Sequence, residues 1–175
     1  MSTEMTHAEL IQIAERWLLG SKGCSFAFTE LKAITHSGEI PDAIGWKSDY
    51  TILVECKATR ADFLSDKNKK FRKNPHLGMG TFRFYLCPQG VIEPQDLPEK
   101  WGLVIVGKKG KPRQVVGPNG NCWSRNSAFC HQQKNLRSET QMMASALRRL
   151  HLRGVLPLIY DNPFDSTEER SAASR

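Results

Sequence analysis

The sequence predicts one α/β domain in which a central mixed β-sheet is flanked by helices. A helix-forming stretch lies between two runs typical of buried strands, Tyr50–Val54 and Thr81–Cys87, so a crossover connection is expected between them. The 175 residues include 39% hydrophobic and 25% charged residues. A chain of this length and composition suits a globular domain with a core of ordinary size.

The chain is expected to begin with an amphipathic helix over Thr6–Leu19. Its apolar residues recur at helical spacing, and Thr6 and Glu9 have the spacing of a capping box. A loosely alternating strand follows over Cys24–Thr35, and Glu39–Trp46 is predicted to pair back against it. This pairing places Asp42 beside the next strand.

Tyr50–Val54 is the predicted central strand, because it is rich in aromatic and β-branched residues. Alternation along the strand puts Leu53, Glu55 and Lys57 on one face and its apolar neighbours on the other. A carboxylate and an ammonium at a strand end are costly to bury without compensation. We therefore expect this strand end to open onto solvent or a metal ion.

Asp42, Glu55 and Lys57 are the candidate catalytic residues. Mg²⁺ prefers oxygen ligands, and Asp42, Glu55 and the backbone carbonyl of Cys56 are expected to supply them from adjacent strands. Lys57 would orient or help to deprotonate the attacking water, which suits phosphodiester hydrolysis. A second Glu-x-Lys triplet, Glu30–Lys32, has no aspartate upstream and is interpreted as a decoy. The alternative is that Glu55 and Lys57 merely flank an exposed edge strand.

These residues resemble a known family. Pro41 and Asp42, followed by an apolar strand and Glu55-Cys56-Lys57, are similar to the signature of the PD-(D/E)XK nuclease superfamily. Later blocks resemble, in order, the helix and strands of MmcB-like DNA repair proteins, and the similarity covers roughly residues 7 to 117. Those blocks are Thr59–Lys67, Phe82–Pro88 and Trp101–Val106.

The resemblance implies a restriction-endonuclease-like core in αβββαβ order with an extra C-terminal helix. It also implies an Mg²⁺- or Mn²⁺-dependent DNA endonuclease acting in DNA repair, recombination or phage-related DNA processing. A glutamate of the first helix often faces the metal in this superfamily, which favours Glu9 here, with Glu15 as the rival. A fold does not establish activity, so a non-catalytic DNA-binding module or a repair-complex scaffold is the alternative.

A helix is predicted over Arg60–Lys73, with Ala61, Phe63, Leu64 and Phe71 directed to the core. Five of the seven residues from 67 to 73 are lysine or arginine. Cations are favoured near a helix C-terminus, but this number exceeds what the helix dipole requires, which favours a phosphate-contacting face. Thr59 and Arg60 lie beside the candidate catalytic residues and are expected to touch the scissile strand. The predicted DNA-binding residues are Thr59, Arg60, Lys67, Lys69, Lys70, Arg72 and Lys73.

The second half of the chain is predicted to add a short strand at Leu103–Val106, a basic turn at Lys108–Arg113 and a helix from Ser138 to about Leu152. The basic turn either grips a phosphate or keeps a hairpin soluble. A capping box from Ser138 to Gln141 would open the helix. We expect a single nuclease-like domain over residues 1–156, with its core at 7–117 and a helical extension at 118–156, and a flexible tail over 157–175.

The net charge of +7 favours a polyanionic partner, and we expect DNA. No apolar run is long enough to span a bilayer and no signal peptide is evident, so a cytoplasmic protein without membrane association is predicted. The five cysteines lack Cys-x-x-Cys spacing, which argues against a disulfide framework or zinc knuckle. Cleavage of both strands of a duplex often uses two copies of one site, which allows a homodimer, although the sequence carries no signal for one.

Overall fold

The computed structural model describes residues 5–161, and six of its strands form one mixed open sheet in the order β1-β2-β3-β4-β5-β6. The first three strands pair antiparallel, β4 and β5 continue parallel to β3, and β6 returns antiparallel. The strands are β1 (Phe26–Thr29), β2 (Ala43–Lys47), β3 (Tyr50–Cys56), β4 (Phe82–Pro88), β5 (Trp101–Val106) and β6 (Pro112–Val116).

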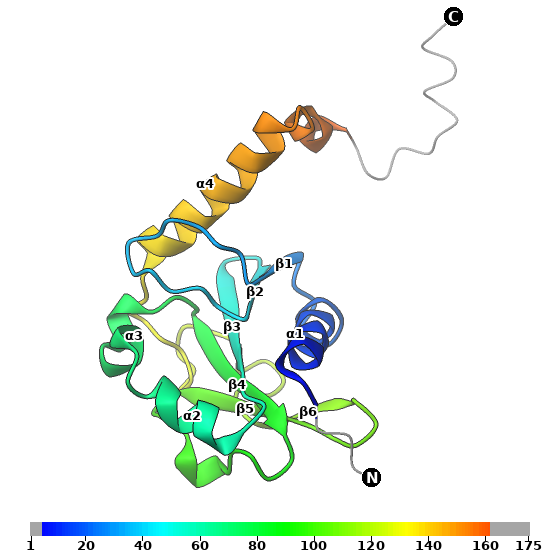
Figure 1. The fold of residues 1–175 in the computed structure, drawn as a ribbon. Coiled ribbons are helices and arrows are strands. Elements are labelled where there is room, and N and C mark those ends of the chain that lie inside the picture. The colour runs from blue at the N-terminus through cyan, green and yellow to red at the C-terminus, as the bar shows by residue number, and fades with distance from the viewer. Residues whose placement is uncertain (1–4, 162–175) are drawn as a thin grey trace, which may run out of the picture.

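Helices cover the two faces of this sheet (Figure 1). The first helix packs on the face formed by Ile52, Val54 and Cys56, whereas Phe63 packs with Leu53 on the other face. The α/β class with a mixed sheet flanked by helices, and the alternation predicted for the central strand, are confirmed. The helices are α1 (His7–Arg16), η1 (Trp17–Ser21), α2 (Arg60–Asp66), α3 (Lys70–Lys73), η2 (Pro75–Leu77), η3 (Pro94–Asp96), α4 (Leu136–Leu152) and η4 (Leu156–Tyr160).

The predicted strand over Cys24–Thr35 is much shorter in the structure. β1 ends at Thr29, and Glu30 adopts a left-handed backbone with φ of 44°. A strand cannot continue through this conformation, so the chain leaves the sheet there. The predicted capping box of the first helix is confirmed, with the Thr6 side chain and the Glu9 carboxylate each accepting from the other's backbone N–H.

The predicted helix over Arg60–Lys73 is wrong in its continuity, because α2 ends at Asp66 and α3 begins at Lys70. In an unbroken helix, residues six apart point about 120° away from each other. The break instead brings Arg72 back onto Asp66, with Nε donating to Oδ2 at 2.8 Å. Of the residues expected in the core, Phe63 is buried and Phe71 is half-buried, whereas Ala61 and Leu64 are exposed.

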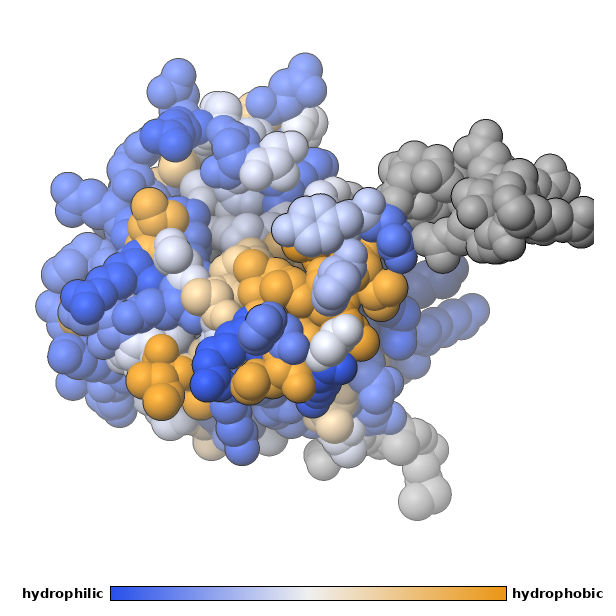
Figure 2. Space-filling view, turned by 90° about the horizontal axis from the view of Figure 1, so that it is seen from above, coloured by the Kyte–Doolittle hydropathy of each residue, from blue (hydrophilic) through white to orange (hydrophobic). Residues whose placement is uncertain are grey.

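The last long helix starts earlier than predicted and leaves the body of the protein. Asn135, and not Ser138, caps α4 by accepting from the Ser138 N–H, so the expected capping box is wrong. Met142 is its last buried residue, and beyond it α4 and η4 project from the sheet (Figure 1). Figure 2 looks down on this end and shows the apolar atoms gathered there. The exposed apolar residues of this end include Leu147, Leu150, Leu152, Val155, Leu158, Ile159 and Tyr160.

A flexible tail was predicted over 157–175. Its first four residues belong instead to the short helix η4. Residues 162–175 lie outside the described residues. The basic stretch at Lys108–Arg113 forms the connection of the β5–β6 hairpin. Within residues 5–161, no helix has the length and apolar character needed to cross a membrane.

One glycine in the sheet makes a direct test of core packing. Gly102 of β5 lies against the Phe84 ring, and a Cβ atom at this position would meet ring carbon Cε1 at 2.2 Å. Gly102→Ala is expected to lower the free energy of unfolding by about 1–3 kcal/mol, because the buried ring must shift. Urea unfolding measures the change, and Gly20→Ala is the control, because nothing lies within 4 Å of a Cβ there. Equal stability of the two variants would contradict this packing.

Candidate functional site

Asp42 lies immediately before β2, at the end of the sheet where β3 finishes. The pairing of Ala43 with Val54 brings the aspartate beside the last residues of β3. Its Oδ2 accepts a hydrogen bond from the backbone N–H of Cys56 at 2.7 Å. Burial, and then the nearby charge of Glu55, raise the pKa of Asp42 above its ordinary value. The sequence therefore placed this carboxylate correctly, next to the middle residue of the Glu-Cys-Lys triplet.

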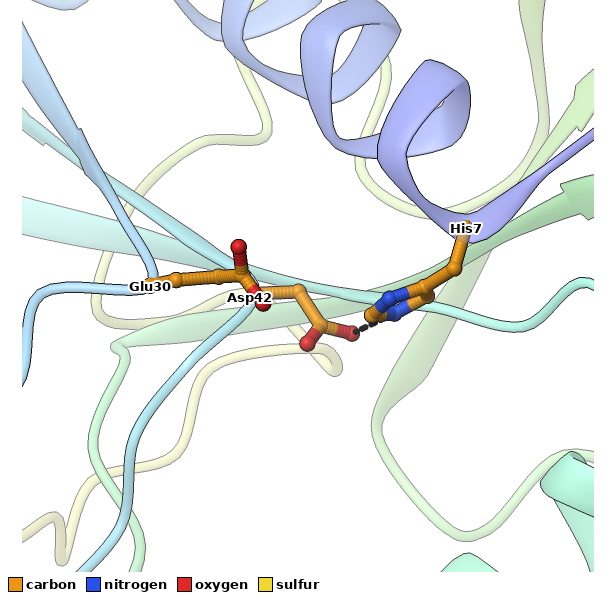
Figure 3. Close-up of side chains that lie close together, drawn as sticks. All are labelled: His7, Glu30 and Asp42. Atoms are coloured by element: carbon orange, nitrogen blue, oxygen red, sulfur yellow. Dashed lines mark ion pairs between the residues drawn. The ribbon is translucent and has the colours of Figure 1, made fainter.

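His7, Glu30 and Asp42 form a group of candidate metal ligands, which we call the open cluster (Figure 3). One ligand atom from each lies within 4.8 Å of the other two, and His7 Nε2 is 3.3 Å from Asp42 Oδ2. Ligands bound at about 2.1 Å to one octahedral ion are roughly 3 Å apart when adjacent and 4.2 Å when opposite. The donor set of one imidazole and two carboxylates therefore fits a divalent ion after small side-chain adjustments.

Local structure explains how these three residues meet. His7 is the first residue of α1, and Glu30 directly follows β1. The antiparallel register places Thr29 opposite Ala43, so Glu30 lies across from Asp42, and its N–H donates to the Asp42 carbonyl. The triplet interpreted as a decoy thus contributes its glutamate to the open cluster. The β1–β2 register that brings Glu30 to Asp42 comes from the structure, and nothing in the sequence singles out His7.

Glu55 and Lys57 are buried in a network of charges on the opposite face of the sheet, which we call the closed network. Lys57 Nζ lies 3.3 Å from Glu55 Oε2 and 3.1 Å from Asp66 Oδ1. Arg72 Nη2 lies 2.9 Å from Glu55 Oε1. The six residues of the network are Glu39, Glu55, Lys57, Asp66, Lys69 and Arg72. β3 lies between β2 and β4, so the alternative of an exposed edge strand is wrong.

Nearby cations favour the charged form of two of the three carboxylates in the closed network, Glu55 and Asp66. Burial raises the pKa of Asp66, but the charges of Arg72 and Lys57 outweigh burial and hold this pKa well below its ordinary value. The pKa of Glu55 is lowered by the same balance, with Arg72 as the largest opposing charge. Burial dominates for Glu39 and raises its pKa, although Arg72 Nη1 donates to it at 2.8 Å.

The predicted metal ligands therefore separate into two environments. Asp42 contacts the start of α1, whereas the Glu55 carboxylate contacts α3, and Glu55 is not part of the open cluster. Cys56 lies between them, with its thiol buried and its N–H on Asp42. Glu9 is engaged by Thr6 through the capping box. The predicted first-helix ligands were Glu9 and Glu15. In the structure, the residue of this helix that contacts Asp42 is His7.

The predicted DNA-binding residues also divide. Arg72 is taken up by the closed network, with its side chain only 4% exposed, so it does not present its charge to a phosphate. Arg60 pairs with Asp96, and Thr59 caps α2 by accepting from the Asp62 N–H. Lys69 is half-exposed while pairing with Asp66. The remaining three are exposed cations along α2 and α3, namely Lys67, Lys70 and Lys73.

Comparison of the chain with protein-family models, with curated proteins and with solved structures finds no match in any of the three. The site is therefore interpreted from its own geometry.

The open cluster predicts binding of a divalent ion. Asp42→Asn and His7→Ala are each expected to weaken Mn²⁺ binding at least tenfold, because each removes one of three ligands. Isothermal titration calorimetry measures the affinity. Glu9→Gln is the matched control, since this carboxylate is on the same helix but bonds Thr6. Unchanged affinity in the first two variants would show that the metal, if bound, lies elsewhere.

The closed network predicts a strong and pH-dependent contribution from Asp66. Asp66→Ala removes a carboxylate that contacts three cations and the Tyr85 hydroxyl, and is expected to cost about 3–5 kcal/mol of unfolding free energy. Because the folded pKa is lowered, this contribution is complete above the unfolded pKa of about 3.9 and falls as the pH drops below it. Urea unfolding at pH 7 and pH 3 tests both points, with exposed Asp62→Ala as the control. A loss below 1 kcal/mol at pH 7 would contradict the assignment.

Proposed function

We propose that the protein is a metal-dependent DNA endonuclease of the PD-(D/E)XK type, with a restriction-endonuclease-like core similar to that of MmcB-like repair proteins. The observation that carries this proposal is the position of Asp42. Its carboxylate is fixed on the backbone of the Glu55-Cys56-Lys57 triplet, and His7 and Glu30 lie within ligand distance of it. DNA repair, recombination or phage-related DNA processing in the cytoplasm is the role that such an activity would serve.

The open cluster is where the proposed ion would bind. Asp42, His7 and Glu30 would hold it, and a bound divalent ion polarises a phosphoryl oxygen and lowers the pKa of coordinated water. An imidazole ligand favours Mn²⁺ over Mg²⁺, since Mg²⁺ prefers oxygen ligands. The raised pKa of Asp42 means that the ligand protonates, and metal affinity falls, at a higher pH than for an ordinary aspartate.

Lys57 would act from the other side of the same strand end. Its ammonium is fixed between Glu55 and Asp66, so its charge is held at one place beside the triplet. The exposed cations Lys67, Lys70 and Lys73 on neighbouring helices would contact DNA phosphates and give salt-sensitive, sequence-independent affinity. The net charge of +7 supports the same class of partner.

The second candidate is a DNA-binding module without turnover, and a specific observation favours it. Glu55 and Lys57 already form buried ion pairs in the closed network, Glu55 with Arg72 and Lys57 with Asp66. A carboxylate paired in this way must leave a buried cation before it can bind a metal ion, and that separation is costly.

Cleavage assays separate the two candidates. The protein is incubated with branched, single-stranded and duplex DNA, with Mn²⁺, with Mg²⁺ or with EDTA. Cleavage is expected with Mn²⁺, and Asp42→Ala and Lys57→Ala are each expected to lower its rate at least a hundredfold while salt-sensitive binding persists. Lys32→Ala is the matched control, because it removes the lysine of the other Glu-x-Lys triplet. Binding of DNA without cleavage of any substrate would reject the enzyme and support the module.

A further inference from the structure

A hollow of about 420 Å³ lies at the end of the sheet opposite to the candidate site. It is bordered by the first residues of β3 and β4, Tyr50 and Phe82, whereas Glu55 is five residues further along β3. At about 3.3 Å per residue, that separation is roughly 17 Å. The chain between β6 and α4 forms the other wall, fastened by the His131 N–H donating to the Thr81 carbonyl at 2.9 Å.

One wall of the hollow is aromatic. Trp123 packs edge-on against Phe82 with ring centroids 4.9 Å apart, and lies nearly parallel to Tyr50 at 6.1 Å. Tyr50 and Phe82 themselves meet edge-on at 5.3 Å. The three rings support one another, so a planar ligand would meet a fixed apolar surface.

The rest of the lining is polar and carries a positive charge that has no acidic partner among the described residues. Arg125 is exposed, and its side chain forms no ion pair with any residue between 5 and 161. Lys134 also lines the hollow, but its ammonium is already bonded to Thr51, Thr81 and Glu139. Arg125 is therefore the cation that remains for a ligand, and a guanidinium suits a phosphate group.

His131 adds a buried nitrogen without a partner at the same place. The residue is only 6% exposed, and its Nε2 has no hydrogen-bond partner among the described residues. Burial is the largest cause of a pKa lowered to about 3, so the ring is neutral at physiological pH. Each nitrogen of a neutral imidazole either donates or accepts a hydrogen bond. A buried polar atom without a partner is rare and favours a ligand that supplies one.

We propose that this hollow binds a nucleotide, with the base against the wall of Tyr50, Phe82 and Trp123 and the phosphate on Arg125. A nucleobase has a planar face that matches the aromatic wall, and its edge carries both hydrogen-bond donors and acceptors for the unpartnered His131 nitrogen. The volume lies within the range of small-molecule sites, about 300–1,000 Å³. This binding does not depend on the open cluster or on DNA cleavage.

The nucleotide has two sources, a free mononucleotide or an unpaired nucleotide of single-stranded DNA. The fluorescent base 2-aminopurine distinguishes them, because stacking quenches its emission. The full chain is titrated in EDTA with 2-aminopurine deoxynucleoside monophosphate, with the same nucleoside lacking phosphate, and with a single-stranded octamer carrying one central 2-aminopurine.

The expected result is saturable quenching of the monophosphate, of the octamer or of both, and the pattern identifies the source. Arg125→Ala is expected to weaken binding of the quenched probe at least fivefold, and to change nucleoside binding less than twofold. Arg113→Ala is the matched control, an exposed arginine on β6 outside the hollow, and should leave binding unchanged. Ser124→Trp places a large side chain on the lining and should abolish quenching of every probe.

Two outcomes would overturn the proposal. One is the absence of saturable quenching with all three probes. The other is an equal loss of affinity in Arg125→Ala and Arg113→Ala, which would indicate non-specific attraction to a positively charged protein. The tests run in EDTA, so failure of the metal-dependent activity leaves their outcome unaffected.

Discussion

The ion pairs of Arg72 are the constraint on which the centre of the structure depends. This side chain lies on the short helix α3 and contacts Glu39, Glu55 and Asp66. The break between α2 and α3 allows these contacts. Three carboxylates and three cations share the closed network, so its formal charge is zero. A buried charge is tolerated only when it is paired and hydrogen-bonded, and the pairing fixes α2, α3 and the end of β3 relative to one another.

The sheet separates two chemically different environments only a few residues apart. On the α1 side, the open cluster of His7, Glu30 and Asp42 is partly exposed, and His7 is the one basic residue among these three. On the α3 side, every carboxylate already has a basic partner. Asp42 is the link between them, because it receives the Cys56 N–H while the charge of Glu55 raises its pKa. A divalent ion would meet the fewest competing charges at the open cluster.

Much of this arrangement was predictable from local sequence. The alternation of Leu53 and Glu55 against Val54 defined the two faces of β3, and the helix cap at Thr6 followed from its spacing to Glu9. The class of fold followed from the helix between two apolar strands. These features depend on period and neighbouring residues, which a sequence displays directly.

The other features depend on long-range contacts. Arg72 was interpreted as a DNA contact because five cations lie close together in sequence. In the structure it pairs instead with carboxylates up to 33 residues away along the chain. Glu30 seemed isolated in sequence, and the β1–β2 register brings it to Asp42. His7 joins them through the packing of α1 on the sheet, a long-range contact that no sequence periodicity encodes. The hollow that His131 lines likewise forms only because the chain that follows β6 packs back against the start of β4.

The order of residues along the chain has a consequence for how the protein assembles during synthesis. All members of the open cluster occur by residue 42, and the antiparallel pairing that joins β1 to β2 is local. Arg72 follows 17 positions after Glu55, a delay of roughly 1–3 s at ribosomal speeds of about 5–20 residues per second. Until that arginine emerges, Glu55 lacks its largest counter-charge. Both layers of the core then wait for later strands, because each includes side chains of β4 and β5.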